Sequence, residues 1–384
     1  MAKVLLVDTN FSSGPIHDAL LAMGHETHVV GRNPQDCLAK VSRHYWQMDY
    51  SDTRLLAELV DRERFDAIVP GCTDVSYASC VQVSQGRYRG LDTREAWHSI
   101  HDKAALRRLL AELGLPAPGR FTATSTESSD RLIVKPVDAF SGKGTTIVPN
   151  GDPTALSSAI KSAENASPTG AYLVEDFVEG QLTSHSAFIR HGRIAHDFFV
   201  REDGTANPFV VDTSHVLPDI EPTIATGVRS AVEQLAEHLG LVDGLVHSQF
   251  ITKGPDFWLL EITRRCPGDL YSQLIELSTG FPYAGAYAMS FLGEALPAQD
   301  TPARFAHVVR HTVSLDTACD LAHVHFKRPL HLERWTPLAL VGDRVEPSPA
   351  SRVGVMFCRE SDQASLAALY ERFLARDVYE IRSA

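Results

Sequence analysis

The chain has 384 residues, more than one compact core usually holds, so two or three domains are expected. Its 48 acidic and 36 basic residues give a formal net charge of −12, which argues against a general nucleic-acid-binding protein. No apolar run reaches the roughly 18–20 residues of a membrane span, and residues 1–8 lack the features of a signal peptide, so we expect a cytoplasmic protein without a membrane segment.

The first part of the chain alternates short apolar runs with helical patterns. Residues 4–7 and 66–70 are runs typical of buried strands, and residues 16–23 have a helical spacing that ends at Gly24. Alternation of strands and helices predicts a small doubly wound parallel α/β domain over residues 1–90. No GxGxxG motif follows a strand here, so no dinucleotide site is assigned.

The rest of the chain mixes helices with hairpins. Asp102 is the expected N-cap of a helix that ends at Gly114. Residues 184–200 and 245–263 each have the pattern of two strands around a turn. Residues 301–384 combine strands with one amphipathic helix. The sequence leaves open whether this last part is a separate domain or completes the preceding one.

The segment IVKPVDAFSGKGTTIV, residues 133–148, combines a strand lysine with a glycine loop. Lys135 ends the strand, where its ammonium group can pair with phosphate oxygens. Gly142 and Gly144 let the backbone approach a ligand closely, and Lys143 between them adds a charge. Taken alone, the segment is equally compatible with an ordinary glycine hairpin that carries solvated lysines.

The segment YLVEDFVEG, residues 172–180, is a strand that continues into a linker. An extended linker of this kind can offer backbone N–H and C=O groups to the edge of an adenine ring. In isolation, a strand that ends in a solvated acidic turn is the favoured interpretation.

Residues 246–269 carry the most specific pattern. Two strands place Gln249 and Glu261 near each other across a hairpin. Thr263 and Arg265 follow Glu261 at intervals of two, so they project from the same face. Oxygen donors beside an arginine are what a magnesium–polyphosphate site needs. The alternative is a surface ion-pair ladder, but the apolar neighbours predict a buried sheet, where unpaired charges are costly.

These three segments, in this order, resemble the ATP-grasp superfamily. The likeness is greater to its carbamoyl-phosphate-synthetase-like members and to the L-amino acid ligases. The resemblance implies a preceding α/β domain at residues 1–90 and an ATP-grasp domain at residues 91–300. Two α+β lobes would clasp ATP, with a mobile lid lobe at about residues 121–200. Residues 301–384 would complete or cap the ATP-grasp domain.

The resemblance also assigns roles to single residues. The positions that contact the nucleotide fall on Lys103, Lys135, Ser141, Gly142, Lys143, Gly144, Glu175, Phe177 and Val178. The positions of the magnesium ligands fall on Glu261, Gln249 and Thr263. Arg265 resembles the arginine that steadies the acyl phosphate, and Lys143 lies in the loop that closes over the transferred phosphoryl group.

The site departs from the family pattern at two positions. Thr263 stands where the family usually has an asparagine, and a hydroxyl ligates magnesium with less reach than an amide oxygen. Leu182, or Gln181 in another alignment, stands where an acid commonly holds the ribose hydroxyls. Gln249 replaces an acid too, but glutamine is known at this position in the carbamoyl-phosphate-synthetase-like branch.

The implied function is an ATP-dependent ligase that activates a carboxylate as an acyl phosphate and joins it to an amine, releasing ADP and phosphate. Its cofactors would be ATP and Mg²⁺, with Mn²⁺ as an alternative ion. Its partners would be a small carboxylate, such as an amino acid, and an amine, and relatives suggest a homodimer. Two alternatives stay open: an ATP-dependent carboxylase that uses carboxyphosphate, and a binding protein that has lost turnover.

Several polar residues are weaker candidates for the substrate site, and each is more often structural in proteins. They are His185, His196, His247, Arg264, Arg310, His311 and Cys266.

Overall fold

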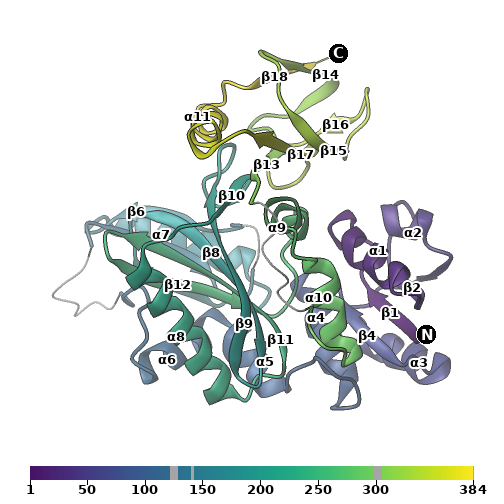
Figure 1. Cartoon of the computed structure of the whole chain (residues 1–384). Coiled ribbons are helices and arrows are strands. Elements are labelled where there is room, and N and C mark those ends of the chain that lie inside the picture. The colour runs from purple at the N-terminus through teal and green to yellow at the C-terminus, as the bar shows by residue number, and fades with distance from the viewer. Residues whose placement is uncertain (122–128, 140–141, 298–304, 384) are drawn as a thin grey trace.

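The computed structural model describes residues 1–121, 129–139, 142–297 and 305–383. Three bodies pack around a central region, with the N-terminal domain and the lid on opposite sides and the C-terminal part above (Figure 1). Over the described residues, no helix is both long enough and apolar enough to cross a membrane.

The N-terminal domain is a four-stranded parallel sheet with the strand order β3-β2-β1-β4. Its strands are β1 (Lys3–Val7), β2 (Glu26–Gly31), β3 (His44–Gln47) and β4 (Ala67–Pro70). The helical segments of this region are η1 (Phe11–Ser13), α1 (Gly14–Ala22), α2 (Cys37–Val41), α3 (Thr53–Glu63), α4 (Asp74–Ser84) and α5 (Arg94–His101). The parallel α/β architecture predicted for this part is confirmed.

An eight-stranded sheet forms the centre of the molecule, in the order β12-β11-β8-β9-β10-β13-β17-β15. Its strands are β8 (Gln181–Arg190), β9 (Arg193–Asp203), β10 (Thr213–Leu217), β11 (Gly244–Lys253), β12 (Asp256–Thr263), β13 (His307–Val313), β15 (Leu332–Pro337) and β17 (Gly354–Glu360). Both predicted hairpins are present in it as the β8–β9 and β11–β12 pairs. The helices packed around it include α6 (Lys103–Glu112), α8 (Pro222–Leu239), α9 (Tyr271–Thr279) and α10 (Tyr283–Leu292).

A small lobe, called the lid here, covers one side of the central sheet. It consists of the strands β5 (Arg131–Pro136), β6 (Thr146–Pro149) and β7 (Tyr172–Asp176) and the helix α7 (Pro153–Ala166). It has its own core of Leu132, Val134, Val148, Ala159 and Ala163. The predicted lid lobe at about residues 121–200 was therefore too long, because β8 and β9 pair with β11 and β10 in the large sheet instead.

The C-terminal part completes the large sheet instead of standing apart. Its strands β13, β17 and β15 extend that sheet beyond β10. The remaining elements, β14 (Cys319–Phe326), β16 (Arg344–Val345), β18 (Tyr379–Ser383) and α11 (Gln363–Leu374), form a cap at that end (Figure 1). The question that the sequence left open is thus decided by strand pairing.

The N-terminal domain shares a continuous apolar core with the helices that follow the site. Ile16 and Leu20 of α1 belong to the same buried cluster as Tyr287 and Phe291 of α10. Removing such side chains from water stabilises the contact by roughly 1.5–3 kcal/mol each. The N-terminal domain therefore forms a fixed wall beside the central sheet.

Candidate active site

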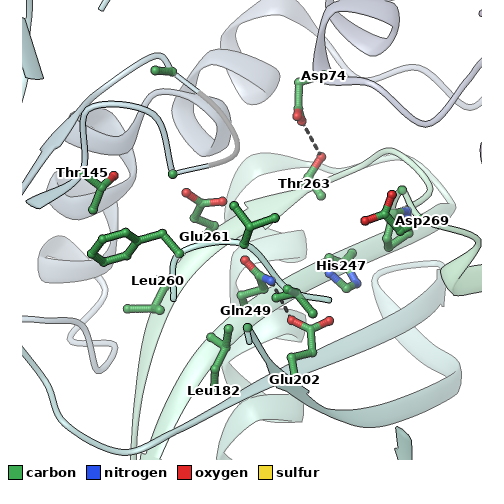
Figure 2. A pocket seen from close by; sticks show the side chains of 18 of the residues that line it. Asp74, Thr145, Leu182, Glu202, His247, Gln249, Leu260, Glu261, Thr263 and Asp269 are labelled. Carbon is green, nitrogen blue, oxygen red and sulfur yellow. Dashed lines mark hydrogen bonds between the residues drawn. The ribbon is translucent and has the colours of Figure 1, made fainter. Parts of the chain in front are cut away.

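A cavity of about 820 Å³ lies between the N-terminal domain, the lid and the large sheet. Its walls come from the lid (Lys135, Thr145), the N-terminal domain (Ser12, Asp74) and the large sheet (Gln249, Glu261). Its lining mixes apolar side chains with polar and charged ones, and the labelled carboxylates include Asp74, Glu202 and Glu261 (Figure 2). A cavity of this size and character fits a small charged ligand.

The three predicted magnesium ligands lie together on β11 and β12. Gln249 and Glu261 are direct cross-strand partners, and Thr263 is opposite His247 on the same pair of strands. All three line the cavity. Their carboxylate, amide and hydroxyl oxygens form a donor set that suits Mg²⁺, which prefers hard oxygen ligands. The residues present therefore fit the ion, with Glu261 as the only carboxylate of the three.

Glu202 fixes the Gln249 side chain and was missed from the sequence. The Gln249 amide donates from Nε2 to Glu202 Oε2 at 2.7 Å (Figure 2). The Ser184 hydroxyl donates to the other carboxylate oxygen at 2.8 Å. Because the Gln249 amide nitrogen donates to Glu202, the amide oxygen is the atom available to bind a cation. Glu202 lies on β9, far from the motif in sequence, so no local spacing could have identified it.

Glu261 faces two ammonium groups. Lys103 Nζ lies 3.0 Å from Glu261 Oε1 and also donates to the Ala139 carbonyl of the lid at 3.2 Å. Desolvation raises the pKa of Glu261, but the charges of Lys103 and Lys135 outweigh it and hold the pKa below its ordinary value. The carboxylate is therefore ionised at neutral pH, as a metal ligand must be.

Lys135 and Glu175 form a buried ion pair behind the cavity. Lys135 Nζ lies 2.7 Å from Glu175 Oε2, and Arg107 Nε lies 2.5 Å from Glu175 Oε1. Lys135 lines the cavity, whereas the Glu175 side chain is 0% exposed and faces these two cations. The Glu175 side chain therefore holds Lys135 at the cavity wall, and the predicted contact of Glu175 with the nucleotide stays a prediction. Phe177 and Val178, next along the linker, do line the cavity.

The glycine loop approaches Phe209, which lies in the segment between β9 and β10. Gly142 and Gly144 have φ values of +67° and +70°, which favour glycine. A Cβ atom on Gly142 would lie 2.5 Å from Phe209 Cβ, so a larger residue would not fit against that side chain. Lys143 is exposed and does not line the cavity in this conformation. Ser141, also predicted to bind the nucleotide, lies outside the described residues.

Arg265 lines the cavity and is paired with an acid of the N-terminal domain. Its Nε and Nη2 atoms donate to the two oxygens of Asp74 at 3.0 and 2.9 Å. The Thr263 hydroxyl donates to Asp74 Oδ1 at 3.3 Å (Figure 2). Asp74 was missed from the sequence because it comes about 190 residues before its partners.

The weaker candidates divide clearly by position. Those that the structure places away from the cavity are His185, His196, Arg264, His311 and Cys266. Arg264, for example, forms a fully buried pair with Asp92 at 2.7 Å, and is therefore structural.

His247 does line the cavity, and its Nδ1 atom is hydrogen-bonded to Ser186 Oγ at 2.7 Å. Burial lowers its pKa to about 3, so the ring is neutral at physiological pH.

The end of the cavity away from the lid is cationic. Arg310 donates to Ser214 Oγ at 2.8 Å and to the Asp269 carbonyl at 2.9 Å. In the part of the chain that the structure describes, no carboxylate forms an ion pair with it, although it is 3% exposed. Arg352 lies nearby, 3.1 Å from Asp269 Oδ1. Asp269 and Arg352 were missed from the sequence. A buried guanidinium without a carboxylate partner is suited to bind an anionic ligand.

Leu182 also lines the cavity, so the departure noted in the sequence concerns a ligand-facing position (Figure 2). Gln181 does not replace the missing acid, because its amide donates to the carbonyl oxygens of Leu182 and Glu202 at 2.8 and 3.0 Å. A ligand at this point of the wall meets a methyl surface instead of a carboxylate.

Comparison with known proteins agrees with this geometry. A sequence model of the ATP-grasp domain family matches residues 100–268. The formate-dependent phosphoribosylglycinamide formyltransferase of Nitratidesulfovibrio vulgaris (strain DP4) is 28% identical over 284 residues, which cover 68% of this chain and 69% of that protein. The carbamoyl phosphate synthase large chain of Streptomyces griseus is 26% identical over 302 residues, which cover 72% of this chain but 26% of that protein. The crystal structure of an L-amino acid ligase from Bacillus licheniformis superposes with a TM-score of 0.81 at 14% identity, covering 100% of this chain and 99% of that one.

Residues 100–268 therefore match the ATP-grasp domain family, and the predicted ATP-grasp fold is confirmed. The chain is an ATP-dependent ligase that is similar in sequence to the formyltransferase and to the carbamoyl phosphate synthase large chain, and similar in fold to the L-amino acid ligase. It spans about a quarter of the length of the carbamoyl phosphate synthase large chain, so the complete activity of that protein is not carried over.

Replacing Lys135 by alanine is expected to weaken ATP binding about 10- to 100-fold, because a charge-assisted contact to phosphate is lost. Glu175 would keep Arg107 as its partner, so the fold should survive. Isothermal titration calorimetry with ATP measures the change. Lys253→Ala, at an exposed strand end, is the control and should bind like the wild type. Equal ATP affinity in the two variants would exclude a phosphate contact by Lys135.

Proposed function

We propose that this ligase joins a small carboxylate to an amine through an acyl phosphate, with ATP as the phosphoryl donor. The observation that carries the proposal is that one cavity is lined both by three oxygen-bearing side chains, Glu261, Gln249 and Thr263, and by three cations, Lys103, Lys135 and Arg265. Phosphoryl transfer depends mainly on positioning and on charge neutralisation, and this arrangement supplies both.

ATP and Mg²⁺ are the cofactors used generally in this superfamily, and we propose that both bind in the cavity. Phe177 and Val178 would lie against the adenine, with Lys135 and Lys103 toward the phosphates. Glu261, Gln249 and Thr263 would hold Mg²⁺, which supplies charge neutralisation and Lewis acidity to the phosphoryl group. The Lys103–Glu261 contact would loosen when the ion and the nucleotide bind. Lys103 would then pair with phosphate, and Glu261 would bind Mg²⁺.

The reaction proceeds in two displacements. A carboxylate oxygen of the first substrate attacks the γ-phosphorus, the bond from that phosphorus to the ADP oxygen breaks, and an acyl phosphate forms. The amine nitrogen then attacks the acyl carbon, the carbon–oxygen bond to phosphate breaks, and phosphate leaves while the amine loses a proton. Arg265 would bind the charged phosphoryl oxygens during both displacements. The glycine loop at Gly142 and Gly144 would exclude water, which otherwise hydrolyses the acyl phosphate.

The cationic end of the cavity indicates where a substrate carboxylate would bind. Arg310 and Arg352 are placed to hold an anionic group by charge-assisted hydrogen bonds. An amino acid or another small carboxylic acid fits this position. The use of Mn²⁺, the cytoplasmic location and the homodimer stay predictions from the sequence.

Magnesium-dependent ADP release tests the proposal directly. The wild-type chain is assayed with single and paired amino acids, with other small carboxylic acids, with amines and with bicarbonate. We expect release that needs ATP, Mg²⁺, one carboxylate and one amine together, with an amide as the product by mass spectrometry. Turnover that needs bicarbonate alone would instead identify a carboxylase. ATP binding without release in any combination would favour a binding protein.

A further inference from the structure

Asp74 brings a charge from the N-terminal domain into the phosphoryl site. Its carboxylate accepts two hydrogen bonds from Arg265 and one from Thr263, at 3.0, 2.9 and 3.3 Å. Asp74, Arg265 and Thr263 all line the main cavity. One carboxylate therefore contacts both the arginine proposed to bind the phosphoryl group and one of the three proposed magnesium ligands.

The backbone around Asp74 is held firmly in place. Asp74 is the first residue of α4, and the hydroxyl of its N-cap Thr73 accepts from the Ser76 N–H at 3.1 Å. The Ser76 hydroxyl in turn donates to the Val7 carbonyl at the end of β1. A carboxylate at a helix N-terminus is further favoured by the helix dipole. Asp74 is thus a rigid partner for side chains that reach it from β12 and from the loop after it.

The contact determines which edge of the Arg265 guanidinium is available. Asp74 occupies the Nε–Nη2 edge. A guanidinium has five N–H donors, and Nη1 also donates to the Cys266 carbonyl at 3.4 Å, so one hydrogen of Nη1 and the second hydrogen of Nη2 are left to face a ligand. Likewise, the Thr263 hydroxyl donates its hydrogen to Asp74 and accepts from the Arg265 N–H at 3.4 Å, which leaves one lone pair for a cation.

A simple tether between domains does not explain the contact. The neighbouring Arg264 already ties the same parts together through Asp92, which also accepts from the Tyr77 hydroxyl of α4 at 2.8 Å. The shared core of α1 and α10 adds a large apolar contact. Because these connections already hold the two parts together, the additional effect of Asp74 is to orient Arg265 and Thr263.

We propose that Asp74 is a positioning residue that holds Arg265 and Thr263 in their working orientations, so that the N-terminal domain forms part of the phosphoryl-transfer site. This inference rests on the proposed function for the roles of Arg265 and Thr263. Through this one carboxylate, the domain at residues 1–90 would orient two side chains of the phosphoryl-transfer site.

The first test compares Asp74→Ala and Asp74→Asn with the wild type. We expect Asp74→Ala to lower kcat about 10- to 100-fold, as loss of an outer-shell partner does, with KM for ATP changed less than about threefold. Asp74→Asn should lie between, since its amide oxygen still accepts one hydrogen bond. Asp61→Ala removes a matched acid–arginine pair on the surface of the same domain, with Arg87 at 2.6 Å, and should leave kcat unchanged. Melting temperatures establish that each variant is folded.

The second test does not depend on turnover. Mn²⁺ binding in the presence of ADP is followed by electron paramagnetic resonance, and Asp74→Ala should bind Mn²⁺ about tenfold more weakly because Thr263 is no longer oriented. The double variant Asp74→Ala/Arg265→Ala should lose less kcat than the two single losses combined, since Asp74 acts in part through Arg265.

Wild-type or faster turnover of Asp74→Ala, with unchanged Mn²⁺ affinity, would overturn the proposal and identify Asp74 as an idle or competing partner of Arg265. Additive losses in the double variant would also overturn it. Failure of the proposed function looks different. In that case the wild type shows no amide synthesis, or Arg265→Ala retains full activity, while the Mn²⁺ measurement still decides whether Asp74 orients the metal site.

Discussion

Replacing Glu261 by glutamine is expected to lower magnesium-dependent turnover at least about 100-fold while the fold stays intact. Glu261 is the only carboxylate among the three proposed magnesium ligands, and its pKa is held below the ordinary value, so the wild-type site offers a full negative charge to the ion. Glutamine has nearly the same volume but no charge. Steady-state ADP release with the substrate pair found for the wild type measures the loss.

The same variant separates metal binding from nucleotide binding. Mn²⁺ affinity in the presence of ADP should fall strongly in Glu261→Gln, whereas the melting temperature should change little because the side chain is about half exposed (51%). Glu112→Gln, at an exposed position of α6, is the control and should behave like the wild type. Wild-type turnover in Glu261→Gln would show that the magnesium site lies elsewhere.

Replacing Glu175 by glutamine is expected to destabilise the protein by about 3–5 kcal/mol. The Glu175 carboxylate is completely buried between Lys135 and Arg107, and its loss leaves two cations without a counter-charge. Differential scanning calorimetry measures the change. The control is Glu179→Gln on the same linker, because its pair with Arg131 is exposed and should contribute less than about 1 kcal/mol. If Glu175→Gln loses little stability but binds adenine nucleotides more weakly, the result would support the nucleotide contact predicted from the sequence.

The destabilisation should depend on pH in a defined direction. Burial raises the pKa of Glu175, but Lys135 and Arg107 outweigh it, so the folded-state pKa lies below the ordinary value. A group of this kind stabilises the fold fully above its unfolded pKa of about 4.3, and the contribution is lost as the pH falls through the folded pKa. The difference in unfolding free energy between wild type and Glu175→Gln should therefore be constant near neutral pH. It should shrink toward zero as the pH falls through the folded-state pKa of Glu175.

The sequence by itself determined the local elements of the site. The pattern of residues 245–263 predicts a hairpin that brings Gln249 near Glu261, and the structure has the two as direct partners, in a register shifted by a β-bulge between Gln249 and Phe250. Gly142 and Gly144 predict a loop with a close backbone approach, and both residues have positive φ values, which favour glycine. Such features depend on neighbours along the chain, and short-range sterics and hydrogen bonding are sufficient to encode them.

Only the tertiary structure decided which residues from distant segments complete the site. Asp74, Glu202 and Arg352 reach the cavity from other elements, and no spacing in the sequence links them to β11 and β12. Burial decided the role of Glu175, which looks like a linker acid in the sequence but pairs with Arg107 on α6. Contacts across long separations depend on the order of strands in a sheet and on how whole domains pack. The residues within one segment do not encode these arrangements, because the free energy that selects them comes from the assembled core.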